Sequence, residues 1–212
     1  MIAIIDYGVG NLFSLKSSLN FLGLDAVVTG QKEALIRADK IILPGVGAFS
    51  DAALKLRNTG LVDTLLAEAN KGKPVLGICV GMQLLFEKSY EYGEHEGLGL
   101  IPGVVASIEE DLTPSLVGGR LQKLKVPHIG WNSLRVGKDD PIFKYFKDGD
   151  FVYYVHSYYA KDCEAYTIGT SDYEVTVPGA VRNANVYGTQ FHPEKSGTVG
   201  LNLLRAFAEV KL

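Results

Sequence analysis

Cys79 lies between two glycines, Gly77 and Gly81, at the end of the apolar run 74–78. A nucleophile flanked by glycines in this way is typical of an elbow turn from a buried strand into a helix, where the glycines let neighbouring backbone pack closely. We expect the turn to aim Cys79 at a cleft, and the start of the helix to favour its thiolate, which is the reactive form. The alternative is a small buried hydrophobe, the commoner role of a cysteine in an apolar run.

His192 and Glu194 can supply the acid–base chemistry that a cysteine nucleophile needs, because histidine takes up and returns protons near neutral pH. His192 follows an apolar strand-like run, at a sheet end where the active sites of α/β proteins collect. If the segment is extended, the two side chains point to the same side, so the carboxylate can hold the imidazole in one tautomer. An isolated His-x-Glu is a weak pattern, and a loop histidine beside a surface acid is the alternative.

Residues 44–47 read Pro-Gly-Val-Gly after the apolar run 40–43, which predicts a glycine-rich turn at a strand end. Such a turn can present free backbone N–H groups to developing negative charge. We expect the N–H groups of Val46 and Val80 to form an oxyanion hole, although an ordinary tight turn is the commoner meaning of Gly-Val-Gly. Neither this turn nor residues 8–10 completes a phosphate-binding glycine motif, so ATP or a dinucleotide is not expected.

The elements that must position these groups change in character near residue 101. Before it, short apolar runs alternate with helical patterns, which indicates βαβ units and a parallel sheet. After it, strand-like segments separated by turn residues predict added β structure, and the spacing of residues 199–210 predicts a last helix that covers the sheet. The expected strands are 2–5, 26–29, 40–43, 74–78, 151–155, 166–170, 179–182 and 186–190, and the earlier expected helices are 11–22 and 81–86.

We therefore expect an α/β fold with an open, mostly parallel sheet flanked by helices and with additional antiparallel β structure in the second half. Residues 1–212 contain no repeat, no low-complexity tract and no linker long enough to separate two domains, so a single domain is expected. A chain of 212 residues, 47% of them hydrophobic, can bury one good core.

Charge and cysteine content narrow the classes of partner. A formal net charge of -3, from scattered residues, gives no electrostatic footprint for nucleic acid or an anionic membrane, so small molecules or proteins are the expected partners. The first residues lack a basic region and reach Asp6 after a short apolar run, so neither a signal peptide nor a membrane span is expected there, and we expect a cytoplasmic protein. Cys79 and Cys163 stand in contexts too different to favour a disulfide, and no metal-type spacing links them.

Three segments together resemble the class I, triad-type glutamine amidotransferases: the Pro-Gly-Val-Gly turn, the Gly-x-Cys-x-Gly-x-Gln elbow and the late His-Pro-Glu. Their order and spacing cover nearly the whole chain. A closer resemblance, to the glutaminase subunits of imidazole glycerol phosphate synthase in histidine biosynthesis, is carried by residues 6–11, 128–132, 154–159 and 195–196, which are more specific than the elbow. Val80 stands where many relatives carry leucine, a conservative difference at a position needed only for its backbone.

The resemblance implies an enzyme that hydrolyses L-glutamine through a thioester on Cys79, with His192 and Glu194 completing a triad and with no cofactor or metal. It implies that Gly47, Gln83, Ser157 and Tyr158 hold the glutamine, and that ammonia passes to a partner cyclase with a (β/α)₈-barrel fold in a heterodimer. We expect Asn11, Trp131 and Lys195 on the surface that meets this partner. A glutaminase serving another synthase and a catalytically silent regulatory module on the same fold are the alternatives.

The remaining histidines and the second cysteine are expected to play no part in the chemistry. His95 lies among acids and glycines and is expected in a solvated loop. His128 and His156 lie in aromatic, strand-like stretches, where a hydrogen-bonded structural histidine is favoured over a second base. Cys163 has acidic neighbours on both sides, which disfavour a thiolate. Trp131 fits either a core position or a partly exposed interface anchor.

Overall fold

The computed structural model describes residues 1–117 and 120–211. Its largest sheet has eight strands, in the spatial order β11-β14-β15-β16-β4-β3-β1-β2. Their bounds are β1 (Ile2–Ile5), β2 (Ala26–Thr29), β3 (Lys40–Leu43), β4 (Val75–Ile78), β11 (Arg135–Val136), β14 (Thr167–Tyr173), β15 (Val175–Asn183) and β16 (Val186–Thr189). Neighbours from β2 to β16 are parallel, and those from β16 to β11 are antiparallel. The predicted fold class is confirmed.

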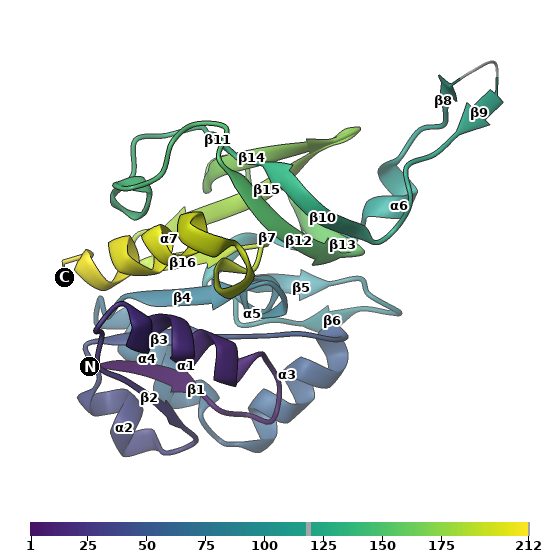
Figure 1. The fold of residues 1–212 in the computed structure, drawn as a ribbon. Helices are drawn as coiled ribbons and strands as arrows, with labels where there is room; N and C mark the ends of the chain where they lie inside the picture. The colour runs from purple at the N-terminus through teal and green to yellow at the C-terminus, as the bar shows by residue number, and fades with distance from the viewer. Residues whose placement is uncertain (118–119, 212) are drawn as a thin grey trace.

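Helices cover both faces of this sheet. On one face, α1 (Leu12–Phe21) and α7 (Gly197–Glu209) lie side by side in front of the strands (Figure 1). The other face carries α2 (Lys32–Arg37), α3 (Phe49–Asn58) and α4 (Val62–Asn70), with α2 packed on α4. The helix after Ile78 is shorter than expected: α5 (Val80–Leu84) ends two residues early, because Phe86 already begins a strand.

The remaining strands form smaller sheets. One has four strands in the order β13-β7-β5-β6, namely β13 (Tyr158–Lys161), β7 (Ile101–Ser107), β5 (Phe86–Ser89) and β6 (His95–Glu96). Two of these strands, β5 and β6, precede residue 101, where the sequence analysis expected the added β structure to begin. The pair β10 (His128–Ser133) and β12 (Phe151–His156) forms an antiparallel ribbon, as does the pair β8 (Ser115–Val117) and β9 (Arg120–Gln122). Short helical segments are α6 (Ile108–Asp111), η1 (Pro141–Phe143) and η2 (Pro193–Lys195).

The pattern of burial explains why these residues form these elements. All four residues of β1 and all four of β4 are buried, as expected for parallel strands covered by helices on both faces. Helix α7 turns an apolar stripe inward, including Leu203, Leu204 and Phe207. Its Gly200 faces the backbone of Pro193 so closely that a Cβ atom would overlap the Pro193 carbonyl. The last helix is thus packed directly against η2, the segment that carries Glu194.

The parallel arrangement of the strands brings the candidate site segments together at the carboxyl ends of the strands. Strands β1, β3, β4 and β16 are consecutive neighbours and run in the same direction, so the segments that follow them meet at the carboxyl ends of the strands. Those segments are residues 6–11, 44–48, 79 and 190–192. Within the described part of the chain, no helix combines the length and apolar character needed to cross a lipid bilayer.

Candidate active site

Cys79 occupies a strained turn between β4 and α5. Its φ and ψ are 54° and −113°, outside the regions that L residues prefer, and its N–H donates to the Thr189 carbonyl of β16 at 2.7 Å. The turn depends on Gly81, because a Cβ atom there would overlap the carbonyl oxygen of Leu43. A Cβ atom on Gly77 would lie 2.6 Å from the Gly81 carbonyl oxygen. Both glycines of the predicted elbow are therefore required by close backbone packing.

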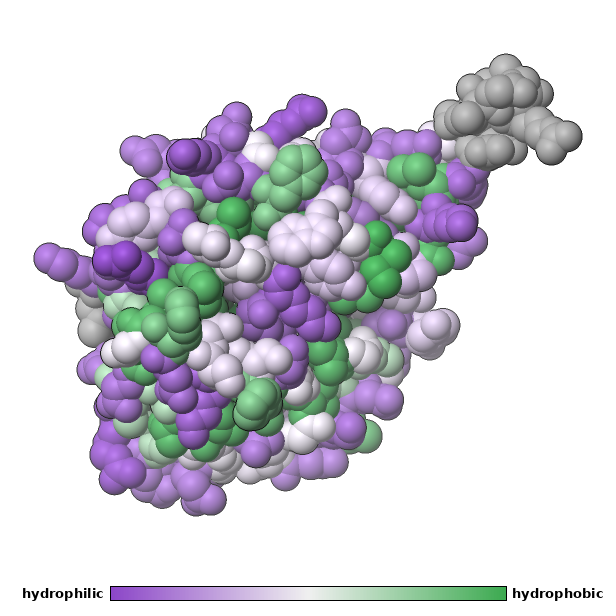
Figure 2. All heavy atoms as spheres, viewed as in Figure 1, coloured by the Kyte–Doolittle hydropathy of each residue, from purple (hydrophilic) through white to green (hydrophobic). Residues whose placement is uncertain are grey.

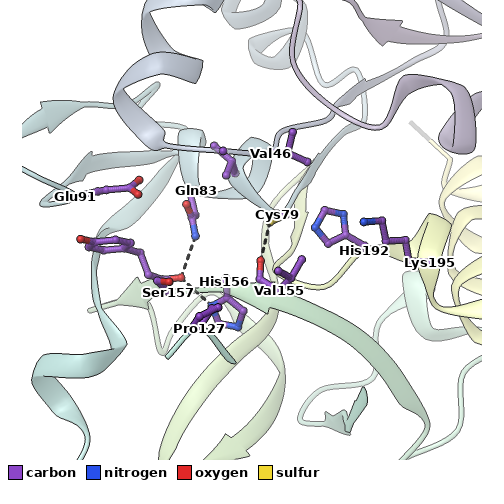
Figure 3. Close-up of a pocket in the computed structure, with 13 residues that line it drawn as sticks. Val46, Cys79, Gln83, Glu91, Pro127, Val155, His156, Ser157, His192 and Lys195 are labelled. Atoms are coloured by element: carbon purple, nitrogen blue, oxygen red, sulfur yellow. Dashed lines mark hydrogen bonds between the residues drawn. The ribbon is translucent and has the colours of Figure 1, made fainter. Parts of the chain in front are cut away.

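The Cys79 side chain is 3% exposed, yet it forms part of a pocket wall. Its Sγ accepts a hydrogen bond from Gln190 Nε2 at 3.7 Å and lies 4.0 Å from the Val155 carbonyl oxygen (Figure 3). A buried cysteine was one alternative from the sequence and a cleft-facing cysteine the other; the structure combines the two. Helix α5 has only five residues, so its dipole is small and the main charge partner of a thiolate here is the neighbouring imidazole.

His192 is fixed from three sides. Its N–H donates to the Tyr153 carbonyl of β12 at 3.0 Å, and its own carbonyl accepts from Ser196 Oγ at 2.7 Å. Its Nδ1 lies 2.9 Å from Glu194 Oε1, with both side chains almost wholly buried. The carboxylate therefore holds the proton on Nδ1 and leaves Nε2 toward Cys79.

The sequence analysis expected His192 and Glu194 to meet because the segment is extended, and this explanation was wrong. Residues Pro193–Lys195 form a turn of 3₁₀ helix, not an extended strand, so alternation of side chains does not apply. The contact arises because the turn begins at Pro193, whose fixed φ suits the first helical position, and folds Glu194 back onto the ring. An extended segment would also have pointed Lys195 away from His192 and Glu194; instead, Lys195 lines the same pocket as Cys79 and His192.

The electrostatics couple His192 to Cys79. Burial alone would lower the pKa of His192, but its interactions with the Cys79 and Glu194 side chains outweigh burial and raise the pKa to about 10. Nε2 has no hydrogen-bond partner among the described residues. Cys79 and Glu194 are thus the two groups that favour the protonated form of the His192 ring.

The turn after β3, residues 44–47, lines the same pocket as Cys79 and His192. Val46 and Gly47 both line the pocket, and Gly47 has a φ of 86°, which favours glycine. The Val46 N–H has no backbone acceptor among the described residues, and the Val80 N–H is at the first helical position, where no intrahelical acceptor exists. Tyr7 holds the turn from behind, since its hydroxyl donates to the Pro44 carbonyl at 2.6 Å. Two backbone donors are thus available beside Cys79.

A cavity of about 380 Å³ opens in front of these groups, and most of the residues singled out from the sequence line it (Figure 3). Its wall comprises Val46, Gly47, Cys79, Val80, Gln83, Glu91, Pro127, Val155, His156, Ser157, Tyr158, His192 and Lys195. Three expected residues are not part of this wall, namely Glu194, Asn11 and Trp131. Asn11 lines a smaller space with Val46 and Glu194, and Trp131 is 55% exposed on β10.

The acidic member of the wall, Glu91, escaped the sequence analysis. It is 8% exposed, and its Oε2 accepts from the Phe49 N–H at 2.6 Å, where α3 begins. Burial raises the pKa of Glu91, and the hydrogen bond from the Phe49 N–H opposes that effect. The sequence analysis also missed Gln190, whose side chain hydrogen-bonds to both Cys79 and Gln83. A buried acid at a pocket wall is a recognisable signal of a ligand site, but only once burial is known.

The other histidines and the second cysteine lie as follows. His128 and His156 are both hydrogen-bonded, as predicted; they are also buried, and they are bonded to each other, which the sequence did not indicate. His95 is half-buried in the short strand β6 and not in a loop. Both cysteines are free. Burial, more than the acidic neighbours named from sequence, raises the pKa of Cys163 to about 11.

A strained cysteine elbow beside a His–Glu pair, at the carboxyl edge of a doubly covered α/β sheet, is the arrangement of a triad-type cysteine hydrolase. A family model described as "Glutamine amidotransferase class-I" matches residues 3–210. The chain belongs to this family of glutamine amidotransferases.

Relatives agree with that assignment, and a solved structure shares the fold. The protein "Imidazole glycerol phosphate synthase subunit HisH" of Listeria monocytogenes serotype 4b (strain CLIP80459) is 46% identical over 99% of this chain and 96% of its own length. The protein of the same name from Bacillus cereus (strain G9842) is 47% identical over 99% of this chain and 95% of its own length. The fold matches "Crystal structure of glutamine amidotransferase" with a TM-score of 0.73 at 20% identity, over 99% of this chain and 98% of the other.

Proposed function

We propose that this chain is the glutaminase subunit of an imidazole glycerol phosphate synthase, which hydrolyses L-glutamine and passes the ammonia to a cyclase subunit. One observation carries the proposal: Cys79 is held at a strained elbow, within the charge field of the buried His192–Glu194 pair, at the wall of a cavity large enough for an amino acid. The identity of nearly half the sequence to the two named subunits, over almost their whole length, supports the choice of synthase.

The reaction that we propose begins when the Cys79 thiolate attacks the side-chain amide carbonyl of glutamine. The oxyanion receives hydrogen bonds from the Val46 and Val80 N–H groups, and His192 gives its proton to the departing nitrogen. Ammonia leaves, and water hydrolyses the glutamyl thioester with His192 as the base. Glu194 keeps the imidazole in the tautomer that both steps need. Gly47, Gln83, Ser157 and Tyr158 would hold the substrate; all four line the cavity.

The test compares ammonia release from glutamine by the purified chain, alone and with the cyclase carrying its own substrate. We expect little release alone and a large increase with the partner, because hydrolysis without an acceptor wastes glutamine. The turn 44–47 is the proposed switch, since rotation of one peptide can supply or remove an oxyanion donor worth roughly 10²–10³ in rate. Equal release with and without the cyclase would contradict the switch. Activation by the ammonia-accepting subunit of a different amidotransferase, and not by the cyclase, would contradict the assignment to imidazole glycerol phosphate synthase.

Glu91 extends the proposed substrate site. Free glutamine carries an α-ammonium group, and Glu91 is the buried carboxylate in the cavity wall, on the same side as Gln83 (Figure 3). We propose that it pairs with this ammonium. Glu91→Gln keeps an oxygen for the Phe49 N–H and removes only the charge, so KM for glutamine should rise about tenfold or more with kcat less affected.

The control for this variant is Glu94→Gln, which removes an exposed acid three residues along the chain. A glutamine analogue without the α-amino group separates loss of the ion pair from a general distortion of the site, because this analogue cannot pair with the Glu91 charge. Parent and Glu91→Gln should hydrolyse that analogue with similar KM values. An unchanged KM for glutamine in Glu91→Gln would remove Glu91 from the substrate site.

For the partner surface we propose the region of Asn11, Trp131 and Lys195, near the cavity mouth. Trp131 packs edge-on against Tyr153, over which Lys195 also lies, with its Nζ 5.8 Å from the ring centre. Ile129 and Phe151 on the same ribbon are 60% and 58% exposed. On the face seen in Figure 2, apolar side chains gather around β10 and β12 as well as over α1. A protein partner would cover this apolar ribbon.

We expect Trp131→Ala and Lys195→Ala to weaken cyclase binding by about tenfold or more without lowering the unfolding midpoint. Phe21→Ala is the control, because Phe21 is also an exposed aromatic residue but lies at the opposite end of α1 from the cavity. Dissociation constants measured for all three variants decide the matter. Normal binding by both Trp131→Ala and Lys195→Ala would place the docking surface elsewhere.

A further inference from the structure

A chain of hydrogen bonds, buried in its middle and part-buried at both ends, runs from the β10–β12 ribbon to the cavity. Asn132 Nδ2 lies 3.2 Å from His128 Nε2, and His128 Nδ1 lies 2.9 Å from His156 Nε2. His156 Nδ1 in turn lies 2.9 Å from the carbonyl oxygen of Tyr158. His128 is stacked between the rings of Tyr154 and Tyr173, which hold it in place. We call these four residues, 132, 128, 156 and 158, the imidazole ladder.

The direction of every bond in the imidazole ladder can be deduced. A carbonyl oxygen only accepts, so His156 carries its proton on Nδ1 and, when neutral, accepts at Nε2. His128 must then donate from Nδ1 and accept at Nε2. Asn132 supplies that donor: its Oδ1 accepts from the Ser133 N–H at 2.8 Å, which fixes the amide orientation and turns Nδ2 toward His128.

Both rings are neutral at physiological pH, as this scheme requires. Burial lowers the pKa of His128 to about 4. Burial, followed by the charge of His128, lowers the pKa of His156 to about 3. Neither ring can therefore serve as a proton donor to bulk solvent near neutrality, and each holds one proton in one defined place.

At its inner end the imidazole ladder meets the groups around Cys79. The Tyr158 carbonyl also accepts from Gln83 Nε2 at 3.0 Å, and the same nitrogen donates to Gln190 Oε1 at 3.1 Å. Gln190 Nε2 then donates to Cys79 Sγ. Both N–H bonds of the Gln83 amide are thus committed, and its oxygen is the group left to face the cavity. The carbonyl that fixes Gln83 is held in place by His156.

We propose that His128 and His156 are positioning residues of the glutamine site: through the Tyr158 carbonyl they fix the Gln83 and Gln190 amides around Cys79, and they connect this site to the ribbon that carries Trp131. The proposal deepens the function proposed above and rests on glutamine being the substrate. Among the described residues, no hydrogen bond joins the imidazole ladder to Glu194 or to the turn 44–47, so its disruption should act on substrate binding more than on the chemical step.

The first test is spectroscopic and independent of function. Long-range ¹H–¹⁵N spectra of the ¹⁵N-histidine-labelled chain report the tautomer of each ring. We expect His128 and His156 to be neutral with the proton on Nδ1 at pH 7, the tautomer that a free imidazole side chain disfavours. A proton on Nε2 of either ring would overturn the imidazole ladder, whatever the protein's activity.

The second test uses two substitutions at His156 in the chain bound to its cyclase. His156→Asn can place its amide nitrogen where Nδ1 stands and still donate to the Tyr158 carbonyl, so KM for glutamine should stay within about threefold of the parent. His156→Leu removes that donor, and KM should rise roughly tenfold or more, with kcat changing less. Equal KM values for the two variants would overturn the positioning role.

Tyr154→Phe is the control for a merely structural effect. It keeps the ring that stacks on His128 and removes only the buried hydrogen bond from the Tyr154 hydroxyl on β12 to Ser171 on β14, so it should lower stability and leave KM unchanged. An equal rise of KM in Tyr154→Phe would overturn the proposal. Should His156→Leu fail to fold, Asn132→Leu at the part-buried outer end must raise KM in its place. A parent complex that releases no ammonia from glutamine contradicts the proposed function instead, and leaves the tautomer result to decide the imidazole ladder.

Discussion

Replacing Cys79 by alanine is expected to reduce glutamine-dependent synthesis by the complex by roughly 10⁴-fold or more, while synthesis from added ammonium salts continues at the parent rate. Only the source of ammonia is lost, because Sγ is the atom that would attack the amide. The backbone of the elbow should survive, since its strained φ and ψ are imposed by the packing of Gly77 and Gly81 and not by the thiol. Both syntheses are measured on the same preparation.

The matched control is Cys163→Ala, which also removes a buried, free thiol. Burial keeps that thiol protonated, and it lies outside the cavity wall, so both syntheses should be retained. A glutamine-like electrophile should label the parent and Cys163→Ala but not Cys79→Ala. Glutamine hydrolysis that persists in Cys79→Ala would remove the residue from the mechanism.

The sequence predicted the elbow because its determinants are local. Two glycines, an apolar strand and a following helix suffice to define the turn, and the glycine requirement reappears as overlaps with Leu43 and with the Gly81 carbonyl. The parallel half of the sheet was equally predictable, since β1, β3 and β4 are short, continuous apolar runs bounded by turn residues. What local patterns could not give was the shape of the segment after His192, where a proline starts a turn instead of extending the strand.

Glu91 and Gln190 could not be predicted for a different reason. Glu91 is buried through a hydrogen bond to Phe49, 42 residues away in the sequence, and no periodic pattern marks such a contact. Gln190 directly follows β16, and its role depends on the pairing of β16 with β4, which brings its side chain to Cys79. Both are products of long-range topology. The histidine pair is similar: the aromatic, strand-like surroundings predicted hydrogen-bonded structural histidines, but the contact between His128 and His156 follows from the antiparallel register of β10 with β12.

Substitution of His192 by asparagine is expected to lower glutamine hydrolysis nearly as much as loss of Cys79, by about 10⁴-fold or more, whereas Glu194→Gln should cost between roughly 10² and 10⁴. Residues that act as a unit are non-additive, so the double variant Cys79→Ala, His192→Asn should be no worse than Cys79→Ala. Glu194→Gln keeps an oxygen for His192 Nδ1 and removes only its charge. A larger loss in Glu194→Gln than in His192→Asn would require the roles to be reassigned.

The variants Cys79→Ala and His192→Asn also test whether Cys79 and His192 interact electrostatically. Cys79 and Glu194 raise the pKa of His192 from 6.5 to about 10, so the ring stays protonated in the folded protein across the neutral range. Because the folded pKa lies above the unfolded one, this interaction stabilises the fold fully below pH 6.5 and is lost as the pH rises through about 10. In Cys79→Ala the main group that raises the pKa of His192 is gone while burial still lowers that pKa, so His192 should titrate at lower pH than in the parent. The titration is followed by ¹H–¹⁵N spectra.

Conversely, His192→Asn should slow alkylation of Cys79 by iodoacetamide at pH 7. Parent-like alkylation in that variant would show that the imidazolium does not sustain the thiolate.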